Sequence, residues 1–161
     1  MSRTTTTSPA ASTSVNSEQI SSMKIQKEIF IEAPIDIAFE YVLEQLGPES
    51  QMEDGKPFAF KLEAWPGGRW FRDLGNNTGH LWGHVQVIKP PKLIELSGPM
   101  MMSYAATNHL QYRLEPEGKG TRLKLTHQAI GMITTPLREG MPKGFQSWLE
   151  RVRQLAENRK R

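Results

Sequence analysis

The chain has 161 residues, with 20 lysines and arginines against 17 aspartates and glutamates, and it contains no cysteine. That length favours one domain whose single hydrophobic core needs neither a disulfide nor a metal to be stable. The absence of thiols excludes cysteine nucleophiles, zinc sites with cysteine ligands and disulfide frameworks, and it fits a cytoplasmic protein.

Polarity divides the chain into a tail and a domain. Serine and threonine dominate residues 1–22, which we expect to be disordered because almost nothing there could be buried. The globular domain is expected at 23–158, with a basic end at 159–161. No apolar run approaches the roughly 20 residues that cross a bilayer, so no membrane insertion is expected. The net charge of only +3 does not favour nucleic acid as a partner.

The domain is predicted to begin with a strand followed by a helix. Residues 24–32 alternate in polarity, with their isoleucines on one face, which is typical of a half-buried strand. Apolar residues then recur at helical spacing over 35–46. Pro34 suits the first turn of that helix, and Gly47-Pro48 ends it.

The middle of the chain predicts an antiparallel meander. Alternating segments begin at Phe58 and continue to Gln128, and together with the first strand they amount to about six or seven strands. The reversals are expected at Pro66-Gly67-Gly68, 75–79 and 116–120, and Pro90-Pro91 ends another strand.

A long amphipathic helix is predicted at the end of the chain. Its apolar residues recur at helical spacing and form a stripe wide enough to lie along a sheet: Phe145, Trp148, Leu149, Val152, Leu155 and Ala156. The fold class is therefore α+β, with a curved antiparallel sheet packed on a long C-terminal helix. One helix on so large a sheet leaves a gap, which large side chains must fill or which remains as an internal cavity.

Several motifs resemble, in their order and spacing, the START-like (SRPBCC) superfamily. Within it, the chain is most similar to the branch of the activator of the heat-shock-protein-90 ATPase, over about residues 23–157. The matching segments are Ala33-Pro34 before a helix carrying Phe39, Trp65-Pro66-Gly67-Gly68-Arg69-Trp70, Gly83-His84-Val85, residues 88–93, 114–116 with 120–127, and Gly144-Phe145. The resemblance implies a helix-grip fold with an internal cavity.

Members of this superfamily bind lipids, hormones, polyketides or client proteins, and some are cyclases or hydrolases. The resemblance therefore implies binding of a small hydrophobic molecule, without a cofactor, as the leading function. An enzyme of the polyketide cyclase/dehydratase or hydrolase type is one alternative, and a stress-related, co-chaperone-like protein-binding module is another. A homodimer is left open.

Aromatic, methionine and other apolar residues of the central strands and the last helix are the candidates for lining the cavity. Tryptophan offers area and one N–H donor, and methionine adapts its shape to a ligand. The expected ligand-binding residues are Trp65, Trp70, Phe71, Trp82, Met100, Met102, Leu110, Tyr112, Leu125, His127, Phe145 and Leu149.

His127 and Tyr112 are the catalytic candidates, because the register expected for the last hairpin turns both toward the core. A histidine satisfied by one hydrogen bond at the edge of the core is the favoured interpretation of His127. No metal site is expected. His80 and His84 would share one face of a strand roughly 13 Å apart, and His109 would face away from His127.

Overall fold

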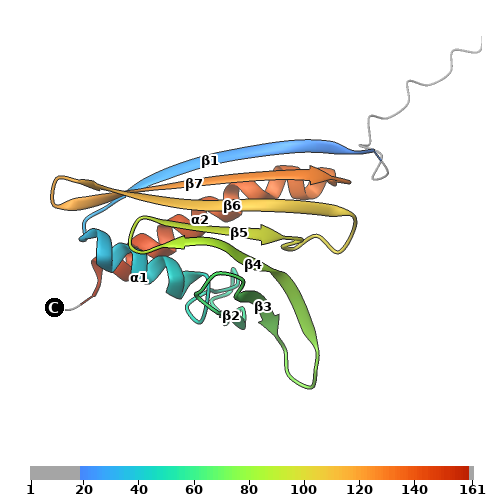
Figure 1. Cartoon of the computed structure of the whole chain (residues 1–161), viewed down its shortest axis with the longest axis horizontal. Coiled ribbons are helices and arrows are strands. Elements are labelled where there is room, and N and C mark those ends of the chain that lie inside the picture. The colour runs from blue at the N-terminus through green and yellow to red at the C-terminus, as the bar shows by residue number, and fades with distance from the viewer. Residues whose placement is uncertain (1–18, 160–161) are drawn as a thin grey trace, which may run out of the picture.

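A computed structural model describes residues 19–159, which form one antiparallel sheet and two helices (Figure 1). Residues 1–18 and 160–161, with most of the predicted tail and basic end, lie outside the described residues. The elements are β1 (Ser21–Ile31), α1 (Ile35–Gln45), β2 (Phe60–Leu62), β3 (Arg69–Asp73), β4 (Gly79–Lys89), β5 (Leu93–Gly98), β6 (Ala106–Glu117), β7 (Gly120–Gly131) and α2 (Thr135–Glu157).

The seven strands lie in the order β1-β7-β6-β5-β4-β3-β2, and every neighbouring pair is antiparallel. Figure 1 shows α2 crossing one face of the curved sheet, whereas the β3–β4 hairpin reaches away from this helix. The predicted α+β helix-grip architecture is confirmed. In the described residues, neither helix is both long and apolar enough to cross a membrane.

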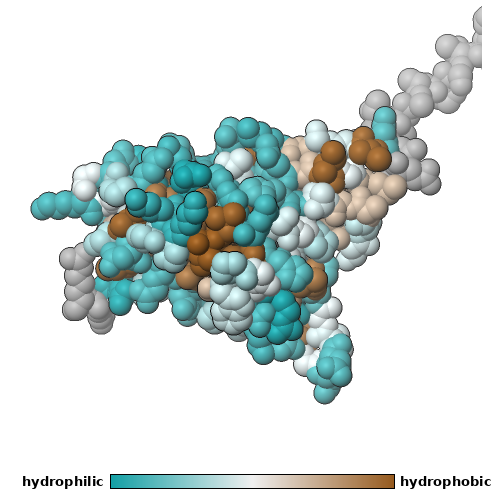
Figure 2. Space-filling model, viewed as in Figure 1, coloured by the Kyte–Doolittle hydropathy of each residue, from teal (hydrophilic) through white to brown (hydrophobic). Residues whose placement is uncertain are grey.

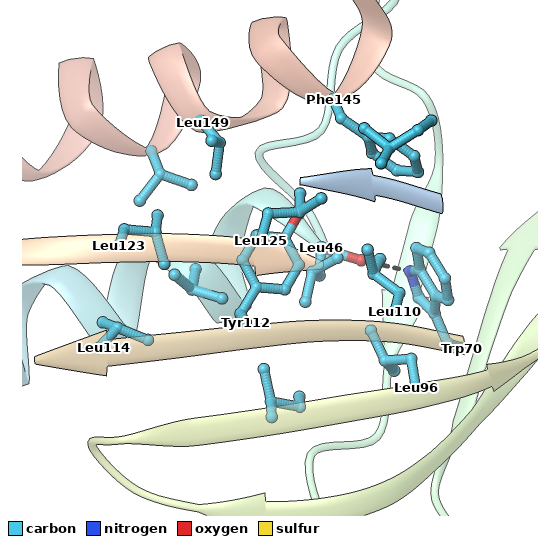
Figure 3. Close-up of a cluster of buried hydrophobic side chains, with 14 of the residues drawn as sticks. Leu46, Trp70, Leu96, Leu110, Tyr112, Leu114, Leu123, Leu125, Phe145 and Leu149 are labelled. Carbon is cyan, nitrogen blue, oxygen red and sulfur yellow. Dashed lines mark hydrogen bonds between the residues drawn. The ribbon is translucent and has the colours of Figure 1, made fainter. Parts of the chain in front are cut away.

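The core lies between the sheet and α2. Alternate residues of β6 and β7 face it, and the register pairs Leu110 with His127 and Tyr112 with Leu125. Phe145 and Leu149 of α2 approach the same cluster from the other side (Figure 3). Burying each large apolar side chain contributes about 1.5–3 kcal/mol, so this contact holds the helix on the sheet.

The opposite face of the sheet is solvated. Seen from the side shown in Figure 2, hydrophilic side chains cover much of the surface, with a large hydrophobic area near its centre and smaller ones toward its edges. An antiparallel sheet with one buried and one wet face produces this alternation of apolar and polar residues.

Helix α2 begins ten residues earlier than its apolar stripe predicted. Pro136 stands in the first turn, and the helix continues through Gly140, Pro142 and Gly144 before it reaches Phe145. These residues are poor helix formers, so local propensity disfavours a helix there. Burial of Met141, in line with the stripe, stabilises the added turns.

Two glycines allow β4 and β5 to approach closely where the sheet bends. A Cβ atom on Gly98 would lie 2.4 Å from the Cα of Gly83 and 2.6 Å from the carbonyl oxygen of Trp82. No side chain fits there. The Trp82 carbonyl accepts a hydrogen bond from the N–H of Met100 at 2.8 Å, which holds Trp82 next to the connection that carries Met101.

We expect Gly98→Ala to lower the free energy of unfolding by about 1–3 kcal/mol, because backbone must move to accept the methyl group. Gly140→Ala is the matched control. A Cβ atom there meets no atom within 4 Å, and replacing a helical glycine by alanine stabilises by about 1 kcal/mol. Urea unfolding of both variants measures the difference. Equal stabilities would contradict the close approach.

Candidate functional site

A cleft of about 630 Å³ opens between the first half of α2, the loop 50–58 and an aromatic wall from the sheet. It is open to solvent rather than enclosed. The lining residues are Ser50, Gln51, Met52, Glu53, Asp54, Phe58, Phe60, Trp82, Met101, Pro136, Leu137, Gly140, Met141, Gly144, Phe145 and Trp148. Its volume lies in the range of about 300–1,000 Å³ that is typical of small-molecule sites.

The rings of the aromatic wall are closely packed, several of them edge to face. The ring of Trp82 meets Phe60 at 4.7 Å and Phe58 at 5.5 Å between centroids, both nearly perpendicular. Trp148 of α2 reaches the same cluster, 6.3 Å from Trp82 and 5.3 Å from Phe145. Each such pair contributes about 0.5–1.5 kcal/mol beyond area burial. The rings therefore stay packed against one another, and the cleft lies beside them.

Two glycines keep the helical side of the cleft open. Gly140 and Gly144 are one turn apart, and a Cβ atom built on either meets nothing within 4 Å. A glycine inside a helix costs about 1 kcal/mol relative to alanine. The helix therefore loses stability at the two positions where side chains would enter the cleft.

Charge is confined to one part of the lining. Glu53 and Asp54 belong to the loop, and Asp54 lies 3.7 Å from the Lys56 ammonium group. The remaining lining side chains are apolar except Ser50 and Gln51. An apolar wall with a polar rim suits a ligand whose body is hydrophobic.

The predicted ligand-binding residues divide into three groups. Trp82 and Phe145 line the cleft. Trp65 is 57% exposed in the turn before β3, and Phe71 is half-buried with the Arg69 guanidinium 4.7 Å from its ring. The other eight are buried in the core and are absent from the cleft lining: Trp70, Met100, Met102, Leu110, Tyr112, Leu125, His127 and Leu149.

Sequence reasoning missed most of the lining. It chose Met100 and Met102, whereas the residue between them, Met101, faces the cleft. The predicted stripe begins at Phe145, so the lining residues in the first turns of α2, from Pro136 to Gly144, are not among the expected ones. Two glycines four residues apart before a helical stripe were the available signal.

His127 is fully buried and belongs to a fixed polar pair. Its Nε2 atom lies 2.8 Å from Oδ1 of Asn108, and the Asn108 amide nitrogen donates to the carbonyls of Gly98 and Pro99 at 3.2 and 3.1 Å. Those two bonds identify Nδ2 and Oδ1, so Nε2 of His127 must carry the proton. Nδ1 is left as an acceptor with no partner in the described part of the chain.

Burial, with a smaller effect from the charge of His109, lowers the pKa of His127 to about 4. The imidazole is therefore neutral near pH 7. Tyr112 is also fully buried, and burial raises the pKa of its phenol above the ordinary value. Its hydroxyl donates to Oε1 of Gln45 over 3.4 Å. Neither catalytic candidate lines the cleft.

The remaining histidines lie apart from this pair. His109 faces the other side of β6, where its Nε2 lies 3.5 Å from Glu95. The expectation that His80 and His84 share a face is wrong. A register shift next to Trp70 pairs His84 with Arg69 and His80 with Arg72, which puts the two histidines on opposite faces.

Acid should weaken this fold through His127. The unfolded chain takes up the proton near pH 6.5, but the folded chain takes it up only near pH 4. Stability is therefore fully present above pH 6.5 and falls as the pH drops to 4, by up to about 3 kcal/mol. Urea unfolding at pH 7 and pH 4.5 should show a smaller loss for His127→Gln, which keeps a donor for Asn108. An identical loss in both proteins would contradict this assignment.

The sheet wrapped on one long helix, with an aromatic cleft beside that helix, defines a helix-grip protein of the START-like class. The family model "Activator of Hsp90 ATPase homolog 1-like protein" matches residues 48–157, and the chain belongs to this family. No curated protein sequence matches it.

Solved structures share the fold at low sequence identity. An uncharacterised protein from Rhizobium leguminosarum is 17% identical, with a TM-score of 0.69 over 88% of this chain and 98% of its own. The Aha1 dimer from Colwellia psychrerythraea is 17% identical, with a TM-score of 0.60 over 84% and 97%. Ara h 8.0201 is 8% identical, with a TM-score of 0.62 over 86% and 100%.

Proposed function

We propose that this protein binds a small hydrophobic molecule in the cleft between α2, the loop 50–58 and the aromatic wall. The observation that carries the proposal is a wall of aromatic side chains facing two helical glycines across open space. Glycine at these positions destabilises the helix. A ligand that binds in the open space would account for glycine there, because a larger side chain would occupy the ligand's place.

The composition of the lining supports an apolar ligand of modest size. Five aromatic rings and three methionines offer contact area, and Met52 and Met101 are exposed enough to rearrange around different shapes. The charged rim leaves room for a polar group of the ligand to face water.

Filling the cleft tests this function. We expect Gly144→Leu to weaken binding of 2-methylnaphthalene at least tenfold, because the new side chain occupies the ligand's space, while the free energy of unfolding is kept or raised. Arg153→Leu, an exposed position on the same helix outside the cleft lining, is the control. Isothermal titration calorimetry measures both. Unchanged binding in Gly144→Leu would exclude this cleft.

A second candidate is a co-chaperone-like, protein-binding role. Three large apolar side chains on or beside the β3–β4 hairpin are exposed, namely Trp65, Leu74 and Leu81, at 57, 53 and 43%. Large apolar side chains that are exposed are a feature of protein-binding surfaces. The family description supports the same role.

We expect the protein to raise the ATPase rate of a heat-shock-protein-90 chaperone, and Trp65→Ala with Leu81→Ser to abolish that increase. Gly144→Leu, which changes only the cleft, should keep it. An ATPase rate of the chaperone that does not respond to the unaltered protein would remove this candidate.

A homodimer also stays a prediction, which multi-angle light scattering of the purified protein checks.

A further inference from the structure

Phe145 separates the cleft from His127. Its ring lines the cleft, and its centroid lies 4.9 Å from that of the imidazole on the other side. The imidazole of His127, which carries the acceptor Nδ1, is therefore one aromatic ring away from the space in which we place the ligand.

The unpaired acceptor is unusual for a packed interior. His127 has no exposed surface, and its Nδ1 has no partner among residues 19–159. A buried acceptor without a hydrogen bond costs about 1–3 kcal/mol, and rotation of the ring cannot relieve this cost. Asn108 fixes Nε2, because its amide nitrogen is already committed to two backbone carbonyls.

The helix is weakest beside Phe145. Pro142 has no N–H group, so the Arg138 carbonyl lacks its helical donor, and Gly144 contributes no side chain to packing. Both weak positions lie directly before Phe145, whereas Leu149 and the residues that follow lie beyond them in the same helix.

We propose that His127 forms an inner part of the binding site, where Nδ1 accepts a hydrogen bond from a hydroxyl or N–H group of the apolar ligand once Phe145 turns aside. This inference rests on the proposed binding function and names its ligand class. The ligand is an apolar molecule with one hydrogen-bond donor, such as a phenol. A ligand with a donor would form the hydrogen bond that Nδ1 lacks, whereas a pure hydrocarbon would leave this acceptor unpaired.

Two probes of nearly equal size test the inference. In the unaltered protein we expect 2-naphthol to bind about tenfold more tightly than 2-methylnaphthalene by calorimetry. In nitrogen-15 NMR spectra at pH 7, 2-naphthol should shift the His127 Nδ1 signal, and 2-methylnaphthalene should leave it near its free value. The indole N–H signal of Trp148, in the cleft, should respond to both probes.

Two variants test whether His127 causes the tighter binding of 2-naphthol. His127→Phe should bind the two probes equally, and His109→Gln, a histidine on the outer face of the same hairpin, should keep the preference for 2-naphthol. Because His127→Phe leaves Asn108 Oδ1 without its donor, its folding is checked by circular dichroism. The NMR measurement on the unaltered protein stands independently of that variant.

The outcomes separate the two proposals. Equal binding of both probes, with the Trp148 signal shifted and the Nδ1 signal unchanged, would overturn the inner site and leave the cleft function standing. No response of Trp148 to either probe would overturn both. A shift of Nδ1 with 2-naphthol alone, together with the tenfold preference, is the result expected.

Discussion

The contact between one face of α2 and the sheet is the constraint on which this structure depends. Met141, Phe145, Leu149, Val152 and Ala156 recur at helical spacing, and all are buried. They hold the helix on β1 and against α1, so its direction across the sheet is set. Along its second half the helix closes the core, and along its first half the same direction leaves the cleft open.

In the first half of α2, the residues that leave the cleft open also lower the stability of the helix. The aromatic cluster of Phe60, Trp82 and Trp148 packs between the sheet and the helix, and the cleft that its rings line is open to solvent. The remaining space exists because Gly140 and Gly144 present no side chains to it. Helix propensity alone would favour alanine there, so the open side of the cleft coincides with the least stable turns of the helix.

Asn108 and His127 form a polar pair in a mostly apolar interior. Asn108 anchors the 98–99 turn through its amide and presents its oxygen to His127. The same geometry decides the tautomer of the imidazole and leaves one nitrogen unpaired. Phe145 touches both this pair and the cleft, which links the two through a single side chain.

The sequence by itself determined the α+β class with an antiparallel sheet and a long last helix, because period-two alternation, turn residues and one helical stripe are local signals, and its motifs implied the helix-grip fold by resemblance. The same alternation on β6 and β7 placed His127 and Tyr112 inward. Only the tertiary structure decided which apolar residues face the cleft and which fill the core. A buried aromatic residue has the same local pattern in either place, and the extension of α2 through Pro142 depends on packing that no local window contains.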